Sequence, residues 1–233
     1  IYYSYYIEKI KDMKKIIYIL AIGFLGINSI SCTQNDNSRV LPEFQEIYSP
    51  ANGDIIFHTS KSSQSPIVQK ITDSKLSHCG IVYVKNGIPY VFEASSKVKL
   101  TKLQTFINNG VDKKYEVMRH TGGLSQSELK KMFAYAQDQI GKSYDLKFEW
   151  SDDKMYCSEL VWKIYKSAGI ELSSPTKFAD YDLSSKEAIK LIETRYNTKI
   201  NLNEDVVTPI QICQDHQNLQ SIYHNYGDRL YAF

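Results

Sequence analysis

The chain has 233 residues, of which 42% are hydrophobic and 23% are charged, a composition typical of a globular protein rather than a disordered one. This length suits one domain with a proper hydrophobic core. The 28 basic and 26 acidic residues leave a formal charge of only +2, so the sequence has no strong electrostatic signal for nucleic acid or for an acidic membrane surface. Partners must therefore be inferred from particular sites.

The N-terminal segment has the pattern of an export signal. Met13 and two lysines precede an apolar run at 16–26, and small and polar residues then lead to Cys32. The run is shorter than the roughly 20 apolar residues of a membrane-spanning helix, but it has the length of a signal-peptide core. A buried helix is the alternative, although the polar stretch after Cys32 has no core periodicity. We expect a signal peptide at 13–31, preceded at 1–12 by an upstream extension outside the fold.

Cys32 is the candidate lipidation site. The segment Ser29-Ile30-Ser31-Cys32 resembles a relaxed bacterial lipobox, in which the cysteine thiol receives a diacylglyceryl group. Ser29 stands where leucine is usual, so simple secretion is the alternative. We expect an anchor and polar tether at 32–50, a folded domain at 51–233, and a cell-envelope protein held to a membrane through Cys32.

The folded part begins with β-rich patterns. A short strand is predicted at 53–57 and a short helix at 65–71. Two β-rich runs, 77–84 and 88–94, flank an Asn-Gly pair, which is the strongest short-range signal for a β-hairpin. Residues 115–119 form another predicted strand.

Helical patterns dominate the second half. A helix is predicted at 124–140, because Ser125 and Glu128 form a capping pattern and Gly141 can end it. Another helix starts near Cys157, and a third is predicted at 185–195. We therefore expect an α+β domain, a small antiparallel sheet or partial barrel packed against helices. The apolar stripe of the first helix consists of Leu129, Met132, Phe133, Ala136 and Ile140, and that of the second of Leu160, Val161, Ile164, Tyr165 and Ala168.

The hairpin brings together two side chains that can support acid–base chemistry. A two-residue Asn-Gly turn pairs Gly80 with Glu93 and makes His78 and Glu93 diagonal neighbours on one face. Their backbones are then roughly 7 to 8 Å apart, within reach of a carboxylate and an imidazole ring. Cys79 points to the other face, into packing, and is a poor candidate nucleophile.

Cys157 is the better candidate, because it stands at the predicted start of a helix. The partial positive charge of a helix N-terminus lowers the pKa of a thiol, and a nearby histidine lowers it further. From its spacing to Leu160 and Val161 we expect Cys157 to share the face that packs on the sheet beside His78. The unpaired N–H groups of that first turn could stabilise an oxyanion. A buried structural cysteine is the alternative.

The remaining cysteines and histidines do not suggest a metal site. With Cys32 assigned to the anchor, Cys79, Cys157 and Cys213 have no paired spacing, so a disulfide framework is not expected. The sequence contains no C-x2-C or H-x3-H spacing of the kind that binds zinc. We expect no metal and no organic cofactor.

Six motifs follow one another along the chain: Gly53-Asp54-Ile55-Ile56-Phe57, Ser77-His78-Cys79-Gly80-Ile81-Val82, Phe92-Glu93-Ala94, Ser143-Tyr144-Asp145 with Phe148, Tyr156-Cys157-Ser158-Glu159-Leu160-Val161 and Val207-Thr208-Pro209. Their order resembles that of the YiiX/YebB-like, circularly permuted NlpC-type cysteine hydrolases, in which histidine precedes cysteine. The resemblance spans about residues 53–212. It implies a permuted papain-like fold and a Cys157-His78-Glu93 triad. Asp54 is expected to hold a turn, and Tyr156 and Tyr144 are the candidate oxyanion and pocket residues.

The resemblance implies an exported cysteine hydrolase that cleaves an amide through an acyl-enzyme. Export beside a cell wall favours a peptidoglycan stem peptide or a small peptide as substrate. A lipid acyl hydrolase or acyltransferase of the same fold is the first alternative, and a catalytically inactive binding lipoprotein is the second. We expect a monomer with no nucleic-acid partner.

Overall fold

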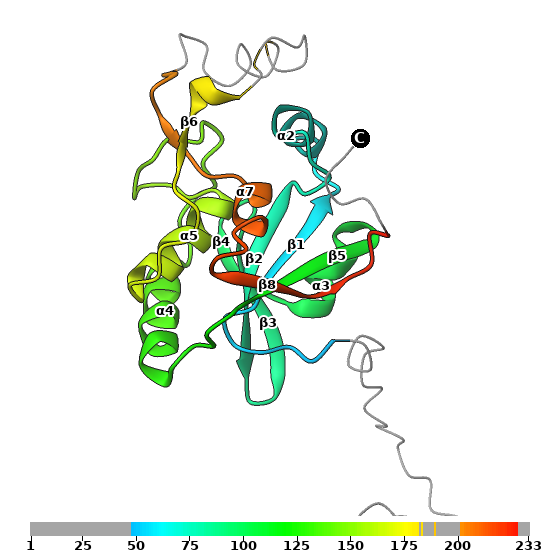
Figure 1. The fold of residues 1–233 in the computed structure, drawn as a ribbon, viewed down its shortest axis with the longest axis vertical. Coiled ribbons are helices and arrows are strands. Elements are labelled where there is room, and N and C mark those ends of the chain that lie inside the picture. Colours follow the sequence, from blue (N-terminus) through cyan, green and yellow to red (C-terminus); the bar gives the residue numbers. More distant parts are fainter. Residues whose placement is uncertain (1–47, 182, 184–188, 190–200, 228–233) are drawn as a thin grey trace, which may run out of the picture. The chain divides into compact units, whose positions relative to one another are not determined.

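The computed structural model describes residues 48–181, 183, 189 and 201–227 (Figure 1). The segment expected for export and Cys32 lie outside these residues. So does the helix expected at 185–195 apart from residue 189, which is helical. Tyr48, which falls in the range expected for the tether, is buried in the domain.

Six strands form one antiparallel sheet in the order β4-β3-β2-β1-β5-β8. A small second sheet pairs β6 (Thr176–Lys177) with β7 (Asp205–Val206). Together with the helices this confirms the expected α+β class. The strands of the main sheet are β1 (Ile55–Ser60), β2 (His78–Lys85), β3 (Ile88–Ala94), β4 (Val98–Lys102), β5 (Gly110–His120) and β8 (Leu219–His224), and the α-helices are α2 (Ser65–Thr72), α3 (Leu103–Asn108), α4 (Gln126–Gln139), α5 (Cys157–Ser167) and α7 (Pro209–Cys213).

The hairpin of β2 and β3 has the predicted register. Asn86 and Gly87 both have positive φ, at 52° and 76°, as a type I′ turn requires. The backbone pairs run from Lys85 with Ile88 to Ile81 with Phe92. This register determines which side chains of β2 and β3 share a face.

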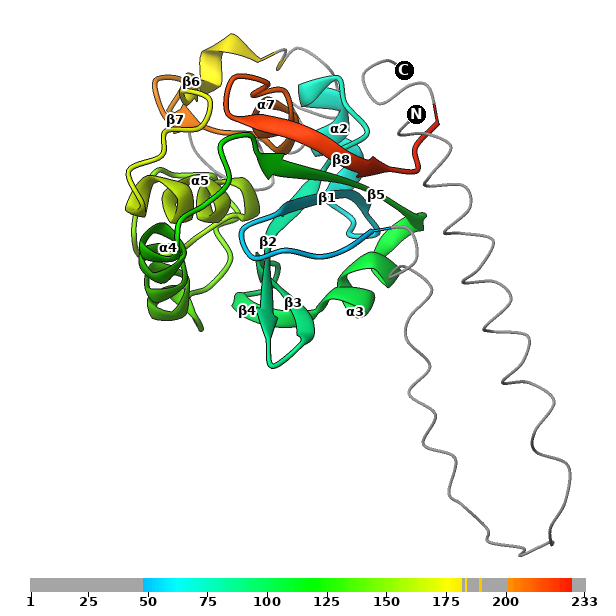
Figure 2. The same ribbon diagram turned by 60° about the horizontal axis from the view of Figure 1, so that its bottom comes forward.

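The two faces of the sheet are covered by different helices, as Figures 1 and 2 show. On one face, α4 and α5 pack over a core that includes Cys79, Ile81 and Phe92. On the other face, α3 covers a second cluster that includes Val82 and Phe106. Strands β1, β2, β3 and β5 therefore supply alternate residues to two separate cores.

This arrangement corrects one prediction. Leu160 and Val161 were expected on the same face as His78, but they pack on the Cys79 face, opposite to it. Cys157 nevertheless meets His78, because the histidine is the first residue of β2 and lies at the end of the strand rather than within the sheet.

Helix α4 begins as its capping pattern predicts. The Ser125 hydroxyl accepts a hydrogen bond from the Glu128 N–H, and the Glu128 carboxylate accepts one from the Ser125 N–H. Gly141 ends this region with φ of +92°. The predicted core position of Ile140 is wrong, because the backbone turns extended at this residue and leaves its side chain 42% exposed.

Four elements, β4, α3, α7 and β8, were not predicted from the sequence. Strand β4 has two lysines among its five residues, and α3 has only six residues, too few to show a clear helical periodicity of apolar side chains. Strand β8 forms by pairing with β5, about a hundred residues earlier in the chain. Such long-range pairing leaves little local signal.

Candidate active site

His78 and Glu93 form a buried pair on neighbouring strands. The His78 Nε2 atom lies 2.7 Å from Glu93 Oε2, and only 8% of His78 and 3% of Glu93 are exposed. The other carboxylate oxygen of Glu93 accepts a hydrogen bond of 2.5 Å from the Thr101 hydroxyl and lies 3.8 Å from Lys99 Nζ. Strand β4, which carries Thr101 and Lys99, therefore fixes the carboxylate that orients the imidazole.

Aromatic rings hold the His78 imidazole in place. The Phe106 ring stacks on it with centroids 5.5 Å apart, and the His58 ring lies 5.2 Å away. His58 can occupy this position because residue 110 is glycine; a Cβ there would lie 2.6 Å from His58 Nδ1. The packing restricts His78 to the orientation that faces Glu93.

Cys157 lies at the first position of α5, and its thiol interacts with both His78 and Cys79. Since Glu93 engages His78 Nε2, the ring nitrogen left for the thiol is Nδ1. Cys79 is fully buried in the core, as predicted. Its contact with the Cys157 sulfur was not predicted, because the strand pattern indicated only its face and not what would cover it.

The charges of the site follow from these contacts. Burial alone would lower the pKa of His78, but hydrogen bonds with Cys157 and Glu93 outweigh burial and raise the pKa to about 10. The hydrogen bond from Cys79 is the largest influence on the pKa of Cys157 and lowers it. Burial raises this pKa and His78 lowers it further, so that it lies well below its ordinary value. Burial favours a neutral Glu93, yet the bond from His78 lowers its pKa to about 2. At neutral pH the favoured state is thiolate, imidazolium and carboxylate.

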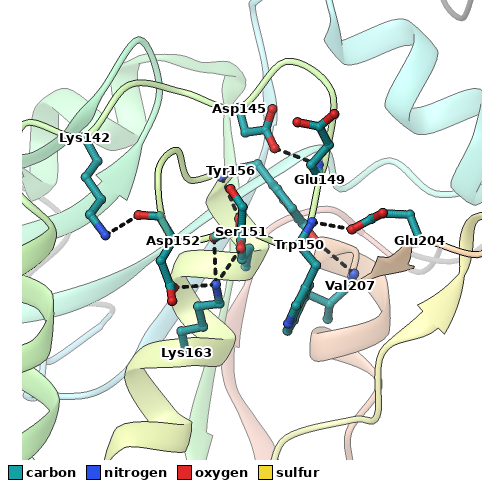
Figure 3. Close-up of polar contacts among 11 residues, drawn as sticks. Lys142, Asp145, Glu149, Trp150, Ser151, Asp152, Tyr156, Lys163, Glu204 and Val207 are labelled. Atoms are coloured by element: carbon teal, nitrogen blue, oxygen red, sulfur yellow. Dashed lines mark hydrogen bonds and ion pairs between the residues drawn. The ribbon is translucent and has the colours of Figure 1, made fainter. Parts of the chain in front are cut away.

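Hydrogen bonds and ion pairs of Lys163 stabilise the loop that leads to Cys157 (Figure 3). The Lys163 ammonium donates to the Ser151 carbonyl and to Asp152, both at 2.9 Å, and pairs with the buried Glu159 at 2.8 Å. Glu159 in turn accepts a hydrogen bond from the Tyr156 N–H, one residue before Cys157. The start of α5 is thus tied to the preceding loop.

The two tyrosines named as candidate oxyanion and pocket residues, Tyr156 and Tyr144, both lie at the site. Tyr156 is buried, its ring meets Phe148 edge-on, and its hydroxyl oxygen accepts a hydrogen bond of 3.2 Å from the Val207 N–H. Tyr144 is half-buried and lines both cavities that flank Cys157 and His78. The hydroxyl of Tyr156 therefore has a structural contact, whereas Tyr144 borders the space that a substrate would occupy.

Two cavities of different character meet at the site. One, of about 60 Å³, is lined by Cys157 and by mostly apolar residues such as Val68, Phe148 and Val207. The other, of about 620 Å³, is lined by His78 and Glu93 and by many polar side chains. A substrate bound across the thiol and the imidazole would therefore meet an apolar and a polar environment.

Among the residues that the structure describes, no group of three or more His, Cys, Asp or Glu side chains is placed to hold a metal ion. Within the same ranges no helix has both the length and the apolar character needed to cross a membrane.

A buried thiol at a helix N-terminus, paired with an imidazole and a carboxylate that precede it in the chain, defines a papain-like cysteine hydrolase in permuted order. Residues 49–223 match the family described as permuted papain-like amidase enzyme, YaeF/YiiX, C92 family, and the chain belongs to this family. It is therefore an enzyme of the cysteine peptidase and amidase type.

Two relatives agree with this assignment. The chain is 44% identical to the uncharacterized protein YiiX of Escherichia coli strain K12 over 163 residues, which cover 70% of this chain and 81% of the relative. It is also similar to the crystal structure described as metalloprotein yiiX from Escherichia coli O157:H7. That match has a TM-score of 0.73 and 41% identity, and it covers 76% of this chain and 99% of the other.

Proposed function

We propose that the chain hydrolyses amides with Cys157 as nucleophile, His78 as acid and base, and Glu93 as the residue that orients His78. One observation carries this proposal: the His78 imidazole interacts with the Cys157 thiol and is hydrogen-bonded at 2.7 Å to Glu93. The pKa values of the thiol and the imidazole are shifted in opposite directions, which favours the charged pair that attacks a carbonyl.

The reaction follows from these charges. The Cys157 thiolate attacks the amide carbonyl, and the imidazolium of His78 gives its proton to the departing nitrogen. The acyl-thioester is then hydrolysed by a water molecule from which neutral His78 takes a proton. The unpaired N–H groups in the first turn of α5 stabilise the oxyanion. These steps use residues of the chain alone.

We assign the substrate to the amides of cell-wall stem peptides or of small peptides, on the basis of the export signal. Lipid acyl hydrolysis is the second candidate, and the apolar cavity beside Cys157 favours it. Both candidates use the same thiol, so they differ in the acyl group rather than in the first chemical step.

Turnover by the purified mature protein tests the function. Muropeptide digests, small peptides and acyl esters are incubated with it, and products are read by mass spectrometry. We expect amide cleavage, and a loss of about a thousandfold or more in Cys157→Ala. The rate should fall at low pH as the thiolate is protonated, and again near pH 10 as His78 loses its proton. Cleavage of acyl esters alone would favour the lipid candidate; undiminished turnover in Cys157→Ala would contradict the assignment of the nucleophile.

The same proposal places the protein in the cell envelope, with its membrane anchor on Cys32. The support is the sequence of the export segment, which ends in Ser29-Ile30-Ser31-Cys32. Metabolic labelling with a lipid precursor should mark the intact protein and leave Cys32→Ala unlabelled and released from the membrane fraction. Cys213→Ala is the matched control and should be labelled normally. A Cys32→Ala protein that still carries label would exclude this anchor.

A further inference from the structure

The polar cavity on the His78 side carries a net positive charge. Lys61 and Lys99 line it, and Glu93 is the one carboxylate among its lining residues. Both oxygens of Glu93 already accept hydrogen bonds, from His78 and from Thr101. The positive charge of the His78 imidazolium offsets that of the carboxylate, so the two ammonium groups set the remaining charge of the wall.

The two lysines retain donors for a ligand. The Lys61 ammonium is exposed and donates to the Asn108 carbonyl at 2.8 Å, which uses one of its three N–H groups. Lys99 approaches Glu93 at 3.8 Å, too far for a good hydrogen bond, and its side chain is 40% exposed. The chain positions of these lysines, before α2 and within β4, are far apart, and the fold brings both to one cavity.

The rest of the wall suits a polar ligand. Seven of the lining residues are serines, and hydroxyl groups can donate to or accept from a ligand. His58 also lines the cavity but is buried, and neither of its ring nitrogens has a hydrogen-bond partner among the described residues. Burial and the nearby charge of His78 lower the pKa of His58, so this ring is neutral and adds no charge.

The proposed reaction indicates which half of the substrate enters this cavity. His78 gives its proton to the departing nitrogen, so the amine half lies on the His78 side, while the acyl half stays with Cys157 beside the apolar cavity. We infer that the polar cavity binds a carboxylate carried by the amine half of the substrate, through Lys61 and Lys99. This inference rests on the proposed function and narrows the substrate class to amides of amino acids or peptides that carry a free carboxylate near the scissile bond.

A pair of alkylating reagents that differ in charge tests the inference without a substrate. Iodoacetamide is neutral and iodoacetate carries a carboxylate, and both alkylate the Cys157 thiolate. The ratio of the iodoacetate rate to the iodoacetamide rate reports the attraction of an anion to the site. Removing two nearby cations should lower this ratio about fivefold or more in Lys61→Gln/Lys99→Gln. High salt should shrink the difference.

Matched variants distinguish this inference from the proposed function. Lys130→Gln/Lys131→Gln removes the same charge from exposed positions of α4 and should leave the ratio unchanged. Each variant's iodoacetate rate is divided by its own iodoacetamide rate, so a change in the thiolate that follows from removing Lys99 from beside Glu93 cancels from the ratio. If the cavity and control variants have the same ratio while Cys157 remains reactive, the inference is wrong and the proposed function stands. If Cys157 reacts with neither reagent, both are wrong.

Discussion

Cys157 is expected to react with iodoacetamide at pH 6 about a hundredfold faster than Cys79 or Cys213. A thiol with an ordinary pKa near 8.5 is well under 1% ionised at that pH, whereas Cys157 is held as a thiolate by Cys79 and His78. Cys79 and Cys213 are also fully buried. Peptide mapping of the folded protein after brief alkylation, repeated from pH 5 to 9, measures all three rates.

Variants of the partners separate their contributions. His78→Ala should slow alkylation of Cys157 at pH 6 about tenfold or more, since the thiolate loses its counter-ion. Glu93→Gln should have a smaller effect, because the amide still holds the ring but no longer stabilises its charge. Gln137→Ala, at an exposed position of α4 that lines neither cavity, is a control that should leave alkylation unchanged. Equal rates for Cys157 and Cys213, unaffected by His78→Ala, would favour a binding lipoprotein instead.

Asp54→Ala is expected to lower the free energy of unfolding by about 3 kcal/mol or more. The carboxylate is 1% exposed and accepts hydrogen bonds from Arg119, at 2.6 and 2.8 Å, from the Tyr48 hydroxyl at 2.6 Å, and from the Ala51 N–H at 2.8 Å. Its removal leaves a buried hydroxyl and a partly buried guanidinium without their acceptor. Urea denaturation measures the loss.

Two comparisons make this result interpretable. Asp54→Asn keeps the size of the side chain and one oxygen, so we expect a smaller loss than in Asp54→Ala. Asp138→Ala removes an exposed carboxylate from α4 and should change the unfolding free energy by less than about 0.5 kcal/mol. A loss in Asp54→Ala no greater than in Asp138→Ala would show that the network around Asp54 contributes nothing. Cys157 alkylation should survive in folded Asp54→Asn, since Asp54 holds the turn before β1 rather than the thiol.

The parts of the fold that could be predicted from the sequence are those set by interactions between residues close together in the chain. The Asn86-Gly87 turn has one favoured geometry, and that geometry sets the register of β2 and β3 and hence the shared face of His78 and Glu93. The capping pair Ser125 and Glu128 likewise specified where α4 begins. In these cases the groups that interact are a few residues apart, so the pattern is visible in the sequence itself.

Tertiary packing decided what lies between distant segments. Strand β8 pairs with β5, and α5 covers the Cys79 face of the sheet instead of the His78 face. The alternation along a strand does not say which face a helix will cover, because this depends on the apolar area that the packing buries. The same packing brings the Cys79 thiol to Cys157. It also gathers Lys61 and Lys99 at one cavity. The sequence named Cys157, His78 and Glu93 as the candidate catalytic residues, but their charge state and the character of their surroundings depend on contacts across long chain separations, which no local pattern encodes.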